Sequence, residues 1–433
     1  MSGYSARRWA AAVTFCVALV FLIAGAARSR LGEVEAYEAR APTPLELTPG
    51  VEAAFPRESY PPGSLASLVL FKRVRGVIVQ VFHAGPERKM TVGYNEMQGV
   101  PVTRAWRAGT LAGGDVVRVR LGAWPSGLYF VRLESADRLI GFAPFVIRPR
   151  RVGEYRIAVV MPTRTWQAYN LRDDDGDGVG NSWYARWKIH TVTLGRPFLN
   201  RGVPYNFRRY DLPFLHWLTR THKQVDVLAD ADLEAVRDGS VLARAYDLIV
   251  FPSHHEYVTT HEYDVIEQYR DLGGNLVFLY ANNFFWQTVK RGNVLERTKL
   301  WRDLGRPEAA LIGVQYRGSD GGHHKAPWII RNTPAGRWLF AGTGLHPGSD
   351  LGEGSVEIDR TFPASPKNVQ VLAEIPNLFG PGFTAQMTYY DTPAGARVFA
   401  AGAFRLLQEP LSPQISRLLH NLWLHLANDN APT

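Results

Sequence analysis

Short and almost entirely apolar runs after residue 150 restrict the fold of this chain more than any other feature. The clearest are Tyr155 to Met161, Tyr246 to Phe251 and Asn275 to Tyr280, and Gln224 to Leu228 is similar. A strand that is apolar on both faces is typical of a parallel sheet covered on both sides. We therefore expect these runs to form buried strands.

The segment between the last two runs carries the signals of a helix. Thr259 and Glu262 have the spacing of a capping box, apolar residues follow at helical spacing, and Gly273-Gly274 ends the segment. A strand, a helix and a strand joined by short connections form a βαβ unit. Residues 151–433 are therefore predicted to form an α/β domain around a mainly parallel sheet.

Residues 50–150 have a different pattern, which predicts an all-β domain. Short runs rich in valine, isoleucine, leucine and phenylalanine alternate with turn-forming residues such as Trp124-Pro125-Ser126-Gly127. The expected strands are Leu68 to Phe71, Gly76 to Phe82, Asp115 to Leu121, Gly127 to Leu133 and Ile140 to Ile147. This spacing favours a β-sandwich, used for packing or recognition.

Residues 1–30 have the pattern of a signal peptide or a membrane anchor, and residues 31–49 that of a linker. Arg7 and Arg8 precede an apolar run from Trp9 to Ala27, about the 20 residues that a membrane-spanning helix needs. Basic residues before such a run stay in the cytoplasm, which places the rest of the chain outside it. We therefore expect an exported protein, either periplasmic or extracellular, or anchored in the inner membrane by this segment.

Composition excludes several functions. The only cysteine, Cys16, lies inside the apolar N-terminal run, so the rest of the chain offers no disulfide, thiolate metal site or cysteine nucleophile. The net charge of +9 is spread along the chain without a basic motif, which argues against nucleic-acid binding. No phosphate-cradling glycine motif occurs, which disfavours nucleotide cofactors.

Polar side chains follow three of the predicted strands. Pro162 to Asn170 follows the first, His254-His255-Glu256 the third, and Asn282 lies just after the fourth. Ligands bind beyond the carboxyl ends of parallel strands, so these groups are expected in one crevice, where they could hold a metal or move protons.

Simpler interpretations of these strand-end residues stay open. Glu256 could only favour the following helix N-terminus, and one histidine of the pair is expected to face solvent. Ser253 is a poor candidate nucleophile because it lacks the Gly-x-Ser-x-Gly elbow.

A second candidate site is the run Asp173-Asp174-Asp175-Gly176-Asp177. Alternating aspartates with a glycine at the bend resemble the first half of a calcium loop, with Asp173, Asp175 and Asp177 as ligands. The twelfth position, which carries a glutamate in an EF-hand, is Tyr184 here. A calcium loop of another type and a solvated acidic loop both remain open. His323-His324-Lys325 is interpreted as a surface loop.

Taken together, the strand-end motifs resemble the N,N-dimethylformamidase large (beta) subunit-like C-terminal domain family. The matching stretches are Thr165 to Asn170, Pro213 to Leu218, Tyr246 to Tyr257, Gly273 to Trp286, Trp301 to Asp303 with Arg306 to Glu308, and Trp338 to Leu345. The resemblance covers about residues 150–427 and extends into the preceding β domain. It implies a glutamine-amidotransferase-like α/β domain.

The resemblance also implies a mononuclear iron site with two tyrosinates and one glutamate, which hydrolyses a small amide. Mapped onto this sequence, Tyr169 and Glu256 become metal ligands and His254 the proton-handling neighbour. Asn282 would hold the substrate carbonyl or the attacking water. A hard metal with oxygen ligands suits this chemistry because it polarises a carbonyl and acidifies water.

One departure affects the implied metal site. The second tyrosine of the family closes an Arg-Pro-Tyr motif, and this chain has Arg196-Pro197-Phe198. Tyr205 or Tyr210 could substitute.

The first hypothesis is therefore an exported metal-dependent amide hydrolase, with a homo-oligomer or a small partner subunit as its assembly. The alternatives are a non-catalytic exported binding module with a degraded metal site, or an envelope protein stabilised by calcium.

Overall fold

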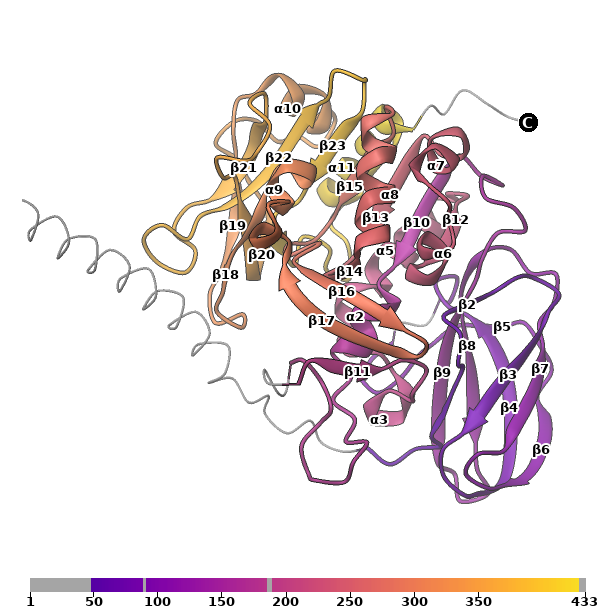
Figure 1. The fold of residues 1–433 in the computed structure, drawn as a ribbon. Helices are drawn as coiled ribbons and strands as arrows, with labels where there is room; N and C mark the ends of the chain where they lie inside the picture. Colours follow the sequence, from indigo (N-terminus) through magenta and orange to yellow (C-terminus); the bar gives the residue numbers. More distant parts are fainter. Residues whose placement is uncertain (1–47, 89–90, 185–188, 428–433) are drawn as a thin grey trace, which may run out of the picture.

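The computed structural model describes residues 48–88, 91–184 and 189–427, which form a mixed α/β protein with several sheets. Figure 1 shows a β region at one side of a large sheet that carries helices on its faces. The predicted N-terminal segment 1–30 and nearly all of the linker 31–49 lie outside the described residues. Among the described residues, no helix is long and apolar enough to cross a membrane.

The β region contains two sheets that share one apolar core. One sheet has the order β1-β3-β7 and the other the order β2-β9-β8-β4-β5, with β6 paired to β4. Alternate residues such as Leu68, Val119, Val79 and Val131 point into the shared core. The strands are β1 (Ala53–Ala54), β2 (Ser59–Tyr60), β3 (Leu65–Leu70), β4 (Val74–His83), β5 (Val100–Pro101), β6 (Trp106–Leu111), β7 (Val116–Arg120), β8 (Gly127–Glu134) and β9 (Ile140–Ile147).

The large sheet is parallel in one half and antiparallel in the other. The four predicted apolar runs form the parallel strands β12 (Asp226–Ala229), β10 (Ile157–Met161), β13 (Leu248–Phe251) and β15 (Asn275–Phe278), in this order. A fifth parallel strand that was not predicted, β23 (Arg397–Ala400), pairs with β15. The antiparallel half continues with β22 (Ala385–Asp391), β21 (Gln370–Ile375), β19 (Lys325–Ile330), β20 (Asp350–Arg360), β18 (Gln315–Ser319) and β24 (Ala403–Phe404).

The prediction of a mainly parallel sheet is therefore wrong beyond β23. The antiparallel strands are interrupted by glycines and polar residues, so they lack the unbroken apolar pattern that marks buried parallel strands.

Helices cover both faces of the parallel half, which explains its apolar strands. On one face, Val160 and Ile249 pack with residues of α7 (Gly239–Ala245), α8 (Thr260–Asp271) and α9 (Glu308–Ile312). On the other, Val159 and Val250 pack with α5 (Leu212–Arg220), α10 (Pro334–Leu339), α11 (Pro413–Leu426) and β8 and β9. The α/β part and the β region therefore share a core.

Shorter elements complete the α/β part. The predicted capping box of α8 is present, with Glu262 N–H donating to Thr259 Oγ1 over 3.2 Å. A separate sheet has the order β11 (Thr191–Thr193), β17 (Val294–Leu300), β16 (Trp286–Arg291) and β14 (Tyr257–Thr259). The remaining helices are α2 (Thr163–Ala168), α3 (Leu199–Gly202), α4 (Phe207–Tyr210), α6 (Asp230–Glu234) and η1 (Trp301–Leu304).

His216 on α5 joins distant parts of the chain. Its Nε2 lies 3.0 Å from Glu87 Oε1 in the β region, and its Nδ1 lies 2.9 Å from Glu409 Oε1 near the C-terminal helix. Burial alone would lower the pKa of His216, but the hydrogen bonds to Glu409 and Glu87 outweigh it and raise this pKa to about 9.

This arrangement predicts a pH-dependent stability. Because the folded pKa of His216 lies above the unfolded value of 6.5, its full contribution is present below the unfolded pKa and is lost as the pH rises through about 9. His216→Asn should lower the free energy of unfolding by about 3 kcal/mol near neutral pH. This loss of unfolding free energy should become smaller in alkaline buffer. Denaturant melts at several pH values measure it. His222→Asn, at an exposed position, is the control, and a pH-independent loss at His216 would contradict the prediction.

Candidate active site

The candidate site lies at β10 of the large sheet, where consecutive strands are added first on one side and then on the other. From β10 the chain passes first to β12 on one side and then to β13 on the other. Such a switch point leaves a crevice at the carboxyl ends of the strands, and ligands bind there. Tyr169 follows β10 through α2, and His254 and Glu256 follow β13 directly. The fold therefore brings two of the polar strand ends together.

A buried ion cluster fixes α2, the short helix that positions Tyr169. The Arg164 side chain is fully buried, and its NH1 lies 2.7 Å from Glu262 Oε1 and 3.1 Å from Glu234 Oε2. Its Nε lies 3.6 Å from Glu58 Oε1, which belongs to the β region. The Arg164 backbone N–H also donates to Asp230 Oδ2 over 2.7 Å. Arg164 therefore ties the start of α2 to α6, α8 and the β region.

Tyr169, His254 and Glu256 converge at the end of α2. His254 Nε2 lies 2.9 Å from the Tyr169 hydroxyl and 3.1 Å from Glu256 Oε2. The Tyr169 hydroxyl also contacts Glu256 Oε2 directly. Glu256 is completely buried, and its second oxygen, Oε1, has no hydrogen-bond partner in the described structure. A buried carboxylate oxygen without a hydrogen-bond partner can bind a cation, and the Tyr169 hydroxyl is close enough to bind the same cation.

His254 is held in one orientation. Its Nδ1 lies 3.1 Å from the Ala281 carbonyl, which can only accept a hydrogen bond, so Nδ1 carries a proton. In the neutral ring Nε2 then carries no proton, and once it is protonated Nε2 donates a hydrogen bond to Glu256 Oε2. Burial alone would lower the pKa of His254, but the hydrogen bond to Glu256 and the charge of Glu357 raise it above its ordinary value.

Tyr257 lies behind these three groups. Its ring packs edge-on against Tyr169, with centroids 5.8 Å apart. Its buried hydroxyl lies beside the Glu256 carboxylate and the Tyr169 hydroxyl. Burial and the nearby Glu256 carboxylate raise the Tyr257 pKa well above its ordinary value, whereas the Arg297 guanidinium acts in the opposite direction. A second phenol oxygen is therefore available beside Glu256.

Asn282 acts through a neighbouring carboxylate. Its Nδ2 donates to Glu357 Oε2 over 3.0 Å, and its backbone N–H donates to Asp359 Oδ1 over 2.9 Å. Burial raises the Asp359 pKa to about 8. Glu357 lines the cavity at the site, whereas Asn282 is not among the residues that line it. Asn282 is thus placed to orient Glu357.

Sequence reasoning missed Glu357 and Asp359. The signal that could have found them is a pair of carboxylates at alternate positions of a strand, in Val356-Glu357-Ile358-Asp359. Both are buried on β20, and buried carboxylates are rare unless they are paired or functional.

The prediction that one histidine of the pair faces solvent is wrong. Both histidines are buried, and burial lowers the His255 pKa to about 3. His255 packs edge-on against Phe251 with centroids 4.9 Å apart, as a neutral core side chain. Ser253 donates its hydroxyl proton to Asp211 Oδ1 over 2.7 Å, and burial raises the Asp211 pKa to about 7.

A cavity of about 1560 Å³ opens onto Tyr169 and His254. Aromatic side chains form much of its wall, among them Tyr205, Tyr210 and Phe404. Tyr205 and Tyr210 thus reach the same cavity as Tyr169, and the Tyr184 ring lies between Tyr205 and Tyr169, with ring centroids 5.9 and 5.6 Å apart.

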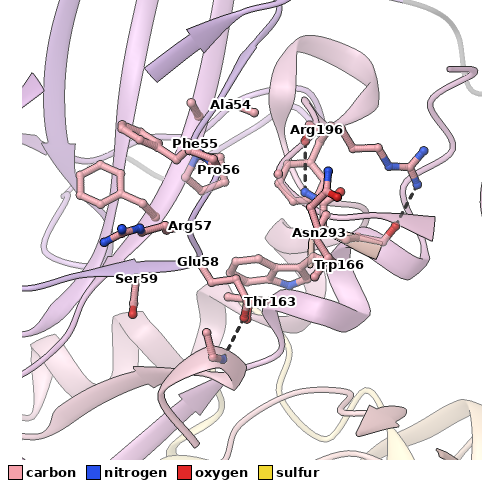
Figure 2. A pocket seen from close by; sticks show the side chains of 18 of the residues that line it. Ala54, Phe55, Pro56, Arg57, Glu58, Ser59, Thr163, Trp166, Arg196 and Asn293 are labelled. Atoms are coloured by element: carbon pink, nitrogen blue, oxygen red, sulfur yellow. Dashed lines mark hydrogen bonds between the residues drawn. The ribbon is translucent and has the colours of Figure 1, made fainter. Parts of the chain in front are cut away.

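Phe198 lies on the other side of α2, against a smaller cavity of about 400 Å³. Figure 2 shows this cavity, with Glu58 and Thr163 close together near Trp166. The Phe198 and Trp166 rings meet edge-on with centroids 6.5 Å apart. Phe198 therefore packs in the core and offers no ligand atom.

The three aspartates of the predicted calcium loop also converge. Asp173, Asp175 and Asp177 each place a carboxylate oxygen within 4.8 Å of the others. Asp173 accepts hydrogen bonds from the N–H groups of Gly178 and Gly176, and these bonds lower its pKa. The loop is joined to the Arg196 guanidinium through Asp174. The loop lies apart from the large cavity, since none of the three aspartates is among the residues that line that cavity.

These observations define an α/β protein with a phenol, an imidazole and a carboxylate at the strand ends of a topological switch point. Residues 117–408 match the family described as N,N-dimethylformamidase beta subunit-like, C-terminal. The chain belongs to this family.

Relatives support the same assignment over a shorter stretch. The N,N-dimethylformamidase beta subunit of Alcaligenes sp is 32% identical over 121 residues, which are 27% of this chain and 15% of the relative. That of Paracoccus aminophilus is 32% identical over 126 residues, 28% of this chain and 16% of the relative. The matched stretch thus spans less than a fifth of either relative.

Among solved structures, a putative ThuA-like protein from Parabacteroides merdae is similar with a TM-score of 0.32 and 13% identity. The similarity covers 50% of this chain and 85% of that one.

The Arg164 cluster yields a stability prediction. Arg164→Gln leaves several buried carboxylates without their cation, so the free energy of unfolding should fall by about 3–5 kcal/mol. The control is Arg75→Gln, which breaks the exposed pair with Asp137 and should cost less than about 1 kcal/mol. Denaturant melts of both variants measure the difference. Equal losses would show that the cluster does not hold α2 in place.

Proposed function

We propose that this chain is a metal-dependent hydrolase that cleaves the C–N bond of a small amide. The observation that carries the proposal is the convergence of Tyr169, His254 and Glu256 beside a large cavity. Membership in a family named for an amide hydrolase gives the reaction class.

The residues present fit a hard metal ion such as iron. Tyr169 and Glu256 supply oxygen donors, and Glu256 Oε1 is buried without a hydrogen-bond partner. We assign the third ligand to Tyr257, whose buried hydroxyl lies beside Glu256 and Tyr169, in place of the phenol that Phe198 lacks. A cation held by these groups supplies Lewis-acid chemistry, since it polarises a carbonyl and acidifies water.

His254 handles the proton in this proposal. Water adds to the amide carbon and loses a proton to His254 Nε2, and the same proton is then given to the departing nitrogen. The C–N bond breaks, which yields a carboxylic acid and an amine. The Ala281 carbonyl fixes the tautomer that leaves Nε2 basic, and Asn282 orients Glu357 at the cavity wall.

Several further assignments belong to the same proposal. We propose that the protein is exported or membrane-anchored by its N-terminal segment, and that the two layers of the β region form a β-sandwich. We also propose a glutamine-amidotransferase-like arrangement for the α/β part. Because the relatives are beta subunits by name, a small partner subunit or a homo-oligomer is the assembly we propose.

The replacement of tyrosine by Phe198 favours one second candidate function, a binding module without catalysis.

Metal analysis separates the two functions. We expect purified protein to contain a transition metal in stoichiometric amount, with iron as the first candidate. Tyr169→Phe, Glu256→Gln and Tyr257→Phe should each weaken metal binding more than about tenfold, because each tyrosine variant removes a ligand oxygen and Glu256→Gln replaces the carboxylate with a neutral amide. Elemental analysis after dialysis measures this, and hydrolysis of N,N-dimethylformamide reports activity.

Tyr205→Phe and Tyr210→Phe are the matched controls, since each removes a phenol oxygen from the same cavity. If Tyr257→Phe keeps its full metal content and Tyr205→Phe or Tyr210→Phe loses metal, the third ligand is the tyrosine replaced in the variant that loses metal. Absence of metal and turnover, with ligand binding retained, would favour the binding module.

A structural calcium ion is proposed for Asp173, Asp175 and Asp177. Calcium should raise the melting temperature of the protein, because an ion that binds only the folded state stabilises it. Asp175→Asn should remove this shift, and Asp137→Asn, an exposed carboxylate elsewhere, should leave it intact. Melting curves with calcium and with chelator measure the effect. An unchanged melting temperature in calcium would identify a solvated acidic loop.

A further inference from the structure

The cavity at the site is larger than a dimethylamide needs, and its wall is rich in cations. Its volume of about 1560 Å³ exceeds the roughly 300–1,000 Å³ of most small-molecule pockets. Five basic side chains line it against three carboxylates, and the basic ones are Arg209, Lys299, Arg302, Arg317 and Arg360. A neutral small amide would leave this charge unused.

Two of these cations lie side by side without a carboxylate partner. Arg317 Nε donates to the Gly382 carbonyl over 3.1 Å, and Arg360 NH1 donates to the same oxygen over 3.4 Å. Within the described residues, neither guanidinium has a carboxylate oxygen within 4.0 Å. Arg302 differs, since its NH2 lies 2.5 Å from Glu308 Oε1.

An irregularity in the sheet produces this pair. The antiparallel register of β18 and β20 pairs Tyr316 with Asp359 and then Gly318 with Ile358, which leaves Arg317 as the extra residue of a β-bulge. A bulge redirects a side chain and is frequent beside active sites. The Arg317 guanidinium lies over the Phe383 ring, 4.1 Å from its centroid, and such a contact orients its plane.

Two guanidiniums that donate to one carbonyl oxygen bring like charges close together. Like charges at short range destabilise a protein unless a counter-charge compensates them. A guanidinium donates paired N–H groups in one plane, a geometry that matches a carboxylate. Both arginines line the cavity that also reaches Tyr169 and His254. Arg360 lies on β20 three residues after Glu357.

We propose that Arg317 and Arg360 form a carboxylate clamp, and that the substrate is an amide whose far end carries a carboxylate. The clamp stands on its own geometry, whereas the identity of the substrate rests on the proposed hydrolase function. The amide lies at Tyr169, His254 and Glu256, and the carboxylate lies at the bulge.

Binding of a matched ligand series tests this proposal. The probes are straight-chain dicarboxylic acids of increasing length, with one end converted to the N,N-dimethylamide, and the methyl ester of each. Isothermal titration with the full chain should show one chain length at which the acid binds about tenfold more tightly than its ester, as expected for charge-assisted hydrogen bonds. Added salt should reduce this preference.

Variants locate the clamp. Arg317→Gln and Arg360→Gln should each remove most of the preference for the acid and leave the affinity for the ester unchanged, which also shows that the cavity is intact. Arg151→Gln removes one exposed charge outside the cavity and should change neither affinity.

The outcomes separate the clamp from the hydrolase. Equal affinities for acid and ester at every length would overturn the clamp, whether or not the amides are hydrolysed. A preference for the acid that survives both arginine variants would overturn it as well, and so would stronger binding of inorganic phosphate than of any acid. Selective binding of the acid without turnover would support the clamp and refute the hydrolase.

Discussion

The buried charge of Arg164 is the constraint on which the rest of the site depends. A guanidinium removed from water is stable only if carboxylates surround it, and here these come from the β region, α6 and α8. Burial raises the pKa of Glu262 to about 7, against the opposing charge of Arg164, so the cluster is costly to form and costly to disrupt. Its consequence is geometric, because Tyr169 follows Arg164 by little more than one helical turn. The β region, which carries no candidate catalytic residue, thereby helps to position the phenol of the site.

The two halves of the large sheet contribute different things to one cavity. The parallel half ends in the groups suited to chemistry, because its strand ends open at the switch point beside β10. The antiparallel half contributes β20, with Glu357 beside these groups and Arg360 farther along the strand. A sheet that were parallel throughout would cover this edge with crossover helices. The mixed sheet therefore explains how a deep site of the family can open into a wide and cationic cavity.

Phe198 occupies a structural position outside the candidate site. The side chain packs against Trp166 and faces the smaller cavity, so it contributes to the core on which α2 rests. A phenol oxygen next to Glu256 is nevertheless present in Tyr257, which belongs to the strand that follows the carboxylate directly. In the proposed metal site, Tyr257 would supply the phenol oxygen that Phe198 lacks.

The sequence by itself determined four of the five strands of the parallel half, five strands of the β region, the capping box of α8, and the polar strand ends with Tyr169, His254 and Glu256. These features depend on local periodicity and on the rule that parallel strands present their carboxyl ends together. Only the tertiary structure decided that the sheet becomes antiparallel after β23, that Asn282 contacts Glu357, and that Arg317 and Arg360 meet at one carbonyl. The physical reason is that these features arise from contacts between distant segments and from a bulge in strand register. The charged and apolar residues of β18 and β20 do not alternate regularly, so their pairing could not be predicted from the sequence.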